Sequence, residues 1–354
     1  MTTIDVKTAG RSAREVLAAS RVTVEPALRA AVDTLPSSMQ RIAGYHFGWW
    51  NEHGQPERTP GAKPSGGKAI RPTLALLSAR AVSDVAGVAA TALPAAIAVE
   101  LVHNFSLLHD DVMDGDVTRR HRPTAWSVFG MNAAILAGDA LLTLALDVLA
   151  ASGHPAATEA TRMLSAAVQD LVEGQSADLA FERGVEVQLA ECLRMAEHKT
   201  GALMGCACAV GALFGGGRPE QIQCLRSFGQ HLGLAFQHVD DLLGIWGDPT
   251  VTGKPVYSDL RSRKKSLPVV AALTSGTPAG LQLADLYHCK APLSNIDLVH
   301  AAELIRIAGG RTWSQIQVDG LLALAMHDLQ ATGPVAQAAG ELGALARLAT
   351  HRDC

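Results

Sequence analysis

The sequence has 354 residues, of which 48% are hydrophobic and 18% are charged, and its net charge at pH 7 is −4. This composition excludes an intrinsically disordered chain, and the absence of a basic excess argues against non-specific binding to nucleic acid. Alanine and leucine are abundant and aromatic residues make up only 4% of the chain, which favours an all-α fold.

In chain order, residues 1–25 are expected to form a loosely ordered leader. A helical segment follows and ends in an aromatic run at residues 44–50. Residues 51–67 are rich in proline and glycine and predict a loop. From Lys68 onward the pattern predicts one helix after another, with breaks near residues 153–155, 215–219, 247–255 and 276–278. We therefore expect a single helical domain over residues 26–354.

The cellular setting is inferred from apolar segments and cysteines. The most apolar stretch, Met131 to Ala151, contains Asp139 and Asp147 and is expected to be a buried helix, not a membrane span. The first twenty residues lack an apolar core of signal-peptide length. The six cysteines form no CxxC pair and show no zinc-ligand spacing. These features predict a cytoplasmic protein with reduced thiols.

Three carboxylates follow an apolar helical segment at residues 100–109. Asp110 and Asp114 are four residues apart and so share a helix face, and Asp111 adjoins them. Unpaired carboxylates at this spacing would repel one another, and a cation removes that cost. No cysteine or histidine pair accompanies them, so magnesium, which prefers oxygen ligands and bridges to phosphates, is the expected ion. A solvated acidic helix end is the alternative.

A second acidic pair, Asp240 and Asp241, ends another apolar segment far downstream. Asp248 lies seven residues after Asp241 and would share its face if the helix extends that far, which Gly244 and Gly247 make uncertain. Two such pairs on facing helices could hold a metal cluster between them.

Basic residues lie beside both acidic groups in the sequence. Lys68 and Arg71 lie in a glycine-rich loop that is not a Walker A motif, because Ala69 replaces its serine or threonine. Further cations are Arg119, Arg120, Lys199, Lys254 and Lys264. Metal-bound carboxylates on one side and cations on the other are how proteins bind diphosphates. A diphosphate held in this way is a better leaving group, which suits ionisation of an allylic diphosphate.

These motifs, in this order, resemble those of the trans-isoprenyl diphosphate synthases, particularly the actinobacterial geranylgeranyl diphosphate synthase type. The matching segments are GGKxxRP at 66–72, DDVMD at 110–114, RRxxPT at 119–124, GQxxDL at 174–179, KTG at 199–201, FQxxDD at 236–241, GKP at 253–255 and DLxxxKxxLP at 259–268. The resemblance implies a single bundle of long antiparallel helices around a deep cavity, and a homodimer.

The resemblance also implies a role for each matched residue. The diphosphate of isopentenyl diphosphate would be bound by Lys68, Arg71, His103 and Arg120. Magnesium, as three ions bound with the diphosphate, would be held by Asp110, Asp114 and Asp240, with Asp111 and Asp241 in support. The allylic diphosphate would be bound by Arg119, Lys199, Thr200, Gln237, Lys254 and Lys264. The expected catalytic set is the five aspartates with Lys199 and Lys254.

Some residues depart from the family pattern or have a second interpretation. The second acidic motif has Gly244 where the family has an aspartate, and whether Asp248 compensates is open. Ala69 replaces a frequent arginine and His121 a frequent glycine. A lone histidine on an apolar helix is usually a core residue, but His103 lies seven residues before Asp110, which favours the ligand role.

Phe105 and Ser106, which stand five and four residues before Asp110, bear on product length. Phe105 is bulky and Ser106 is small, and in the resembled family one aromatic at the fifth position before the motif goes with the twenty-carbon product. We therefore expect geranylgeranyl diphosphate, made from isopentenyl diphosphate and a dimethylallyl, geranyl or farnesyl primer. The alternatives are a farnesyl diphosphate synthase, a class I terpene cyclase, which would leave Lys68 and Arg71 unexplained, and a non-catalytic regulatory subunit, which should have lost its carboxylates.

Overall fold

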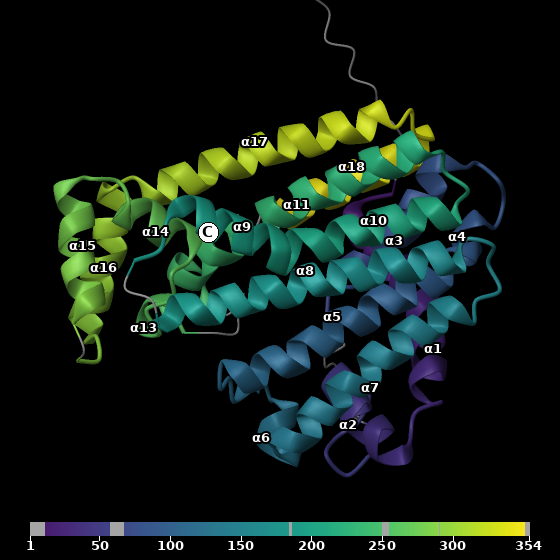
Figure 1. Cartoon of the computed structure of the whole chain (residues 1–354), viewed down its shortest axis with the longest axis horizontal. Coiled ribbons are helices and arrows are strands. Elements are labelled where there is room, and N and C mark those ends of the chain that lie inside the picture. The colour runs from purple at the N-terminus through teal and green to yellow at the C-terminus, as the bar shows by residue number, and fades with distance from the viewer. Residues whose placement is uncertain (1–10, 57–66, 184–185, 250–254, 290, 351–354) are drawn as a thin grey trace, which may run out of the picture. The chain divides into compact units, whose positions relative to one another are not determined.

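The computed structural model describes residues 11–56, 67–183, 186–249, 255–289 and 291–350. Nearly all regular structure in these ranges is helical (Figure 1). The strands within these described ranges are β1 (Thr118–Arg119) and β2 (Arg122–Pro123), which form a short antiparallel hairpin. The all-α prediction is therefore confirmed.

The chain divides into two compact units, which we describe separately. Unit 1 comprises residues 1–166, 206–226 and 329–345, and unit 2 comprises residues 167–205, 227–328 and 346–354. The divisions fall within five helices, which are α8 (Ala157–Arg183), α10 (Ala202–Phe214), α11 (Pro219–Trp246), α17 (Gly310–Ala331) and α18 (Ala336–Thr350).

Each unit also has helices of its own. Those of unit 1 are α1 (Ala13–Val32), α2 (Ser37–Phe47), α3 (Ile70–Val82), α4 (Val88–Thr91), α5 (Leu93–Met113), α6 (Ala125–Phe129) and α7 (Met131–Ala150). Those of unit 2 are α9 (Leu189–Ala196), the π-helical turn η1 (Glu197–Gly201), α13 (Ser258–Arg261), α14 (Leu267–Leu273), α15 (Pro278–His288) and α16 (Asn295–Ile307).

Helix α1 begins within the segment that we expected to be a leader. Ser12 and Glu15 form a capping box, in which the Ser12 hydroxyl accepts from the Glu15 N–H and the Glu15 carboxylate accepts from the Ser12 N–H. Every fourth residue of α1 is then buried, namely Val16, Ser20, Val24, Leu28 and Val32. This face packs against α3 and α5, so the expected order boundary at residue 25 is wrong for residues 13–25. Residues 1–10 lie outside the described part of the chain.

Helices α5 and α7 pack along one another in unit 1 (Figure 1). Residues 95–102 of α5 are all buried, which places this helix in the core. Helix α7 is long and apolar enough to cross a membrane by length and composition alone, and 39% of its apolar window is buried within the chain. The helix packs on α5 and is buried on that side only, since Met131 and Leu136 are exposed.

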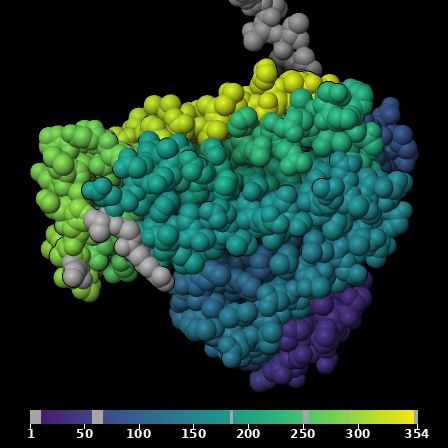
Figure 2. Space-filling view, in the orientation of Figure 1, coloured from purple at the N-terminus to yellow at the C-terminus, as the bar shows by residue number. Residues whose placement is uncertain are grey.

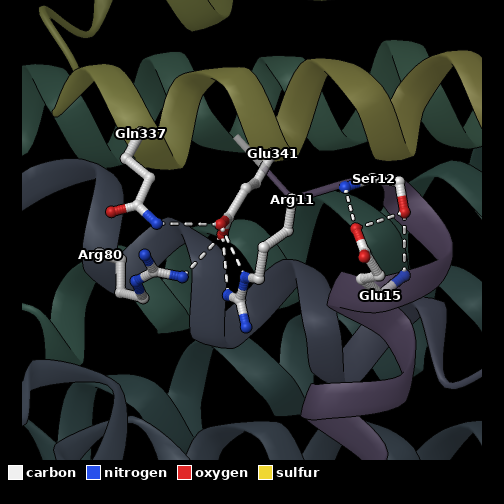
Figure 3. Close-up of polar contacts among 6 residues, drawn as sticks. All are labelled: Arg11, Ser12, Glu15, Arg80, Gln337 and Glu341. Atoms are coloured by element: carbon white, nitrogen blue, oxygen red, sulfur yellow. Dashed lines mark hydrogen bonds and ion pairs between the residues drawn. The ribbon is translucent and has the colours of Figure 1, made fainter. Parts of the chain in front are cut away.

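A buried ion-pair cluster ties the start of the described chain to α18 (Figure 3). The Glu341 side chain is fully buried and accepts hydrogen bonds from Arg11 at 3.0 Å, Arg80 at 2.7 Å and Gln337 at 3.3 Å. Burial opposes the charge of Glu341, but the hydrogen bond from Arg11 and the attraction of Arg80 outweigh it and lower its pKa. The cluster joins α3, α18 and the segment before α1 within unit 1.

Unit 2 has its own apolar cores. One of them joins α11, α14, α15 and α16 through residues that include Ile245, Val269, Leu283, Leu298 and Ile305. Helices α15 and α16 pack against each other and form part of the surface of this unit in Figure 2. Leu281 and Ile296 of these helices are exposed. These cores hold α11, whose residues 240 and 241 are the second acidic pair.

Candidate functional site

The first acidic group lies at the C-terminal end of α5. Asp110 and Asp111 are in its last turn and Asp114 is its C-cap residue, with no basic residue in that turn. Negative side chains at the negative end of a helix dipole are unfavourable, and a bound cation would compensate them. The end of α5 therefore concentrates the charge that a hard cation requires.

Arg119 of β1 faces these carboxylates. Its Nε donates to Asp111 Oδ1 at 2.7 Å, and its Nη2 lies 3.8 Å from Asp110 Oδ2. Asp111 is buried, and burial raises its pKa to about 6 although Arg119 opposes the shift. Its second oxygen, Oδ2, is buried without a hydrogen-bond partner in the described chain. This oxygen can accept a hydrogen bond from water bound to a nearby cation, which fits the supporting role expected for Asp111.

The hairpin that carries Arg119 has a strained tip. Arg120 and His121 are the two residues between its strands, and both have positive φ, 51° and 64°. A two-residue hairpin turn of this kind favours glycine or asparagine at both positions. This geometry explains why the resembled family has a frequent glycine at the position of His121, which the sequence alone did not reveal.

A pocket in unit 1 opens between this hairpin and α2. Its lining includes His46, Asp111, Arg119, Arg120 and Thr124. Burial, together with the nearby Arg120 and Arg119, lowers the pKa of His46 to about 3, so this histidine is neutral at pH 7. We did not predict His46, because in the sequence it belongs to an aromatic run that indicated only packing.

Two of the residues predicted to bind isopentenyl diphosphate are in direct contact. Arg71 Nη1 donates to His103 Nε2 at 3.2 Å, so His103 is a neutral acceptor. Burial first, and then the positive charges of Arg71 and Arg120, lower the pKa of His103 well below its ordinary value. Lys68 is exposed at the approach to α3, and the N-cap residue Ala69 has a φ of 53°.

In unit 2, Asp241 is held by two donors. Gln237 Nε2 donates to Oδ1 and the Leu267 N–H, at the start of α14, donates to Oδ2, both at 2.8 Å. Thr200 donates in turn to Gln237 Oε1 at 2.6 Å. Burial raises the pKa of Asp241 to about 7 against the attraction of Lys264. Asp240 is exposed on the same helix. Asp241 is therefore fixed by hydrogen bonds, while the Asp240 carboxylate is accessible from the surface.

Lys199 is positioned by the GQxxDL motif, whose role its sequence does not indicate. Its Nζ donates to Asp178 Oδ2 at 2.6 Å, and Asp178 belongs to the GQxxDL segment of α8. Burial opposes the charge of Asp178, but the attraction of Lys199 and Lys264 outweighs it and lowers the pKa. In the same motif, a Cβ at Gly174 would lie 2.4 Å from the Lys199 backbone nitrogen. The GQxxDL motif therefore packs against the π-helical turn that carries Lys199 and fixes its side chain.

The structure also changes the interpretation of the second acidic motif. Helix α11 ends at Trp246, so Asp248 is not on its face with Asp241, and it is exposed beyond the helix. A Cβ at Gly244 would lie 2.2 Å from Asp259 Oδ2. The carboxylate of Asp259 therefore fills the space that a side chain at position 244 would need.

The remaining predicted residues have these positions. Phe105 is buried and packs edge-on against the His109 ring, with the ring centroids 4.8 Å apart. The Ser106 hydroxyl donates to the His103 carbonyl at 2.8 Å. Lys254 lies outside the described residues. Arg122, in the basic run after Arg119, instead has a structural role, because it donates to the carbonyls of Tyr45 and Trp50.

Within the described residues, no three histidine, cysteine or acidic side chains converge closely enough to hold a metal by themselves. An ion bound to either carboxylate group would complete its shell with other oxygens. Magnesium does this, since it usually takes one or two carboxylates together with water and substrate phosphates. The oxygen-only donors of both groups fit that ion.

Known proteins share this fold and these motifs. A family model described as polyprenyl synthetase matches residues 62–305. The chain therefore belongs to the polyprenyl synthetase family, the trans-isoprenyl diphosphate synthases, and it is a prenyltransferase that elongates prenyl chains. This confirms the resemblance drawn from the motifs.

Individual relatives narrow the comparison. The (2E,6E)-farnesyl diphosphate synthase of Mycobacterium tuberculosis H37Rv is 47% identical over 305 residues, 85% of this chain and 83% of that protein. The geranylgeranyl diphosphate synthase of the same organism is 44% identical over 342 residues, 96% of this chain and 94% of that protein. The two relatives differ in product, so they leave chain length open.

Solved structures confirm the expected isoprenoid synthase fold. A polyprenyl synthetase from Streptomyces coelicolor A3(2) has a TM-score of 0.88 and 45% identity, and the match covers 95% of this chain and 98% of that one. A geranylgeranyl pyrophosphate synthase from Corynebacterium glutamicum, in complex with isoprenyl diphosphate and magnesium, has a TM-score of 0.75 and 26% identity over 96% of this chain and 98% of that one.

Proposed function

We propose that the chain is a geranylgeranyl diphosphate synthase. It joins isopentenyl diphosphate head to tail to an allylic diphosphate by ionisation, condensation and elimination of a proton. The observation that carries the product assignment is the pair at residues 105 and 106. Phe105 is buried one turn before the acidic group, while the small Ser106 folds its hydroxyl back onto the His103 carbonyl. One isoprene unit needs about 5 Å, roughly one helical turn, which a small side chain at position 106 would leave free.

Two sets of side chains divide the substrates in this proposal. Lys68, Arg71, His103 and Arg120 bind the diphosphate of isopentenyl diphosphate. The contact between Arg71 and His103 supports this set, because it keeps the histidine neutral and the guanidinium oriented. The allylic diphosphate is held by six residues, which are Arg119, Lys199, Thr200, Gln237, Lys254 and Lys264. The hydrogen bond to Asp178 orients Lys199, and the hydrogen bond between Thr200 and Gln237 orients those two side chains.

Asp110, Asp114 and Asp240 would hold magnesium, as three ions, with Asp111 and Asp241 in support. When bound, magnesium neutralises the departing diphosphate and so favours ionisation of the allylic carbon–oxygen bond. Asp111 and Asp241 orient their neighbours through the bonds to Arg119, Gln237 and the Leu267 N–H. Magnesium in the complex of the Corynebacterium glutamicum relative supports this choice of ion.

We also propose a cytoplasmic homodimer. Helix α7 exposes Met131, 53% accessible, and Leu136, 57% accessible, although it is the most apolar long helix of the described chain. A second copy would remove this apolar surface from water.

Product analysis tests the proposed function. The purified chain is incubated with isopentenyl diphosphate, magnesium and each allylic primer, and the dephosphorylated alcohols are separated by chromatography. The proposal predicts a twenty-carbon alcohol as the main product from every accepted primer. A fifteen-carbon main product would assign the chain to farnesyl diphosphate synthesis, which the 47% identical relative makes the second candidate.

A further inference from the structure

Arg21 of α1 contacts the loop that carries the predicted isopentenyl diphosphate cations. Its Nη2 donates to the Gly67 carbonyl at 2.7 Å. Gly67 immediately precedes Lys68, and α3 with Arg71 begins three residues after Gly67. Arg21 is half-buried, and the neighbouring Ser20 and Val24 lie on the buried face of α1. The helix is therefore fixed where Arg21 reaches across to the loop.

Gly67 is also in contact on another side. A Cβ at Gly67 would lie 2.6 Å from Arg120 Nη2 and 3.2 Å from its Cζ. The guanidinium of Arg120 therefore packs against the bare Cα of Gly67. Arg21 and Arg120, from distant parts of the chain, thus both contact Gly67. Arg21 binds its carbonyl, and Arg120 occupies the space that a side chain would need.

A buried carboxylate links the same arginines electrostatically. Glu100 of α5 is buried, and this burial raises its pKa although the positive charges of Arg71, Arg120 and Arg21 oppose the shift. Its Oε1 accepts from Asn104 Nδ2 at 3.1 Å. Three arginines therefore lie in the surroundings of one buried acidic residue, which favours an anion beside Lys68.

We propose that Arg21 is a positioning residue of the isopentenyl diphosphate site. Its bond to the Gly67 carbonyl fixes the backbone that presents Lys68 and forms the surface against which Arg120 packs. The need for such a restraint is visible at Ala69, which adopts a left-handed conformation with φ of 53° just before α3. This inference rests on the proposed function, and it gives α1 a part in substrate binding.

The test compares Arg21→Ala and Arg21→Lys with Arg14→Ala, an exposed arginine of the same helix. Steady-state kinetics give KM for each substrate, calorimetry gives the Kd of isopentenyl diphosphate without the allylic substrate, and thermal unfolding reports stability. Loss of the contact should raise KM and Kd for isopentenyl diphosphate about tenfold in Arg21→Ala, with KM for the allylic substrate and kcat within about twofold. Arg21→Lys should recover part of the loss, and Arg14→Ala should match the wild type.

An active wild type whose Arg21→Ala variant keeps both KM values and the Kd, or loses affinity for both substrates equally, would overturn the assignment. If Arg21→Ala does not fold, Arg21→Lys decides, because unchanged affinity for isopentenyl diphosphate in that variant would also overturn it. A wild type that forms no prenyl product would instead contradict the proposed function, which separates the two failures.

Discussion

At the scale of single residues, the tip of the β1–β2 hairpin holds two side chains in an unfavourable backbone conformation. Arg120 and His121 have φ of 51° and 64°, and a left-handed conformation costs about 1–2 kcal/mol for a residue with a Cβ. Strain of this size persists where the surrounding structure enforces it, often at functional sites. Here the turn places the two neighbouring arginines in different contacts. Arg119 donates to Asp111, and Arg120 packs against Gly67.

Replacing His121 by glycine should therefore stabilise the fold. We expect His121→Gly to raise the free energy of unfolding by about 0.5–1 kcal/mol, since relief of strain exceeds the entropic cost of glycine. Denaturant unfolding measures the change. His53→Gly, at an exposed turn position without positive φ, serves as the control and should be neutral or destabilising. A less stable His121→Gly variant would show that the tip is not strained.

Phe105 and Ser106 should set where the growing chain stops. We expect Phe105→Ala to lengthen the main product beyond twenty carbons, because it removes a buried ring, and Ser106→Phe to shorten it to fifteen carbons by filling the space of one isoprene unit. Chromatography of the dephosphorylated alcohols gives the product ratio, which does not depend on how much enzyme is folded. An unchanged product distribution in both variants would place the limit of the pocket elsewhere.

At the scale of elements, α1 and the Glu341 cluster hold the N-terminal part of the chain to unit 1. Removing one member of a buried ion pair is costly because it leaves the partners uncompensated. Arg11 and Arg80 retain some contact with water, at 42% and 25% accessible, which moderates that cost. The cluster should therefore contribute measurably to stability, and in a pH-dependent way.

Glu341→Gln should lower the free energy of unfolding by about 2–3 kcal/mol at pH 7. The pKa of Glu341 is lowered in the folded state, so its contribution is present above the ordinary value of 4.5 and is lost as the pH falls through the folded value. The difference between wild type and variant should therefore shrink below pH 4.5. Unfolding curves from pH 3 to 7 measure it, with the exposed pair variant Glu303→Gln as a control expected to change little. A difference that does not vary with pH would contradict the role of the charge.

The elements also show which features the sequence could predict. The spacing of Val16, Ser20 and Val24 and the Ser12–Glu15 capping pattern are visible signals for α1, and they argue against the leader that we expected. The acidic motifs and their place at helix ends were predictable from local pattern. The contact of Asp178 with Lys199 was not, because only helix packing brings together residues that are 21 positions apart. For the same reason, spacing indicated Asp248 and not Asp259 as the neighbour of Gly244.

At the scale of the whole molecule, the exposed apolar residues of α7 predict self-association. The wild type should sediment as a dimer at micromolar concentration, and Leu136→Glu should shift it to the monomer because it places a charge in the proposed interface. Analytical ultracentrifugation measures both. Val22→Glu, on an exposed position of α1 that is 76% accessible, is the matched control and should stay dimeric. A monomeric wild type would contradict the dimer, and a dimeric Leu136→Glu variant would place the interface elsewhere.

In the proposed function, the chain ionises an allylic diphosphate with magnesium and condenses it with isopentenyl diphosphate. The most direct measurement incubates the purified protein with farnesyl diphosphate alone, isopentenyl diphosphate alone, and both together, each with magnesium or with a chelator. We expect a longer linear prenyl diphosphate only when both substrates and magnesium are present. Both diphosphates must be bound, each by its own set of basic residues, before the carbon–carbon bond forms. A cyclic hydrocarbon from farnesyl diphosphate alone, or no product from both substrates with magnesium, would contradict this account.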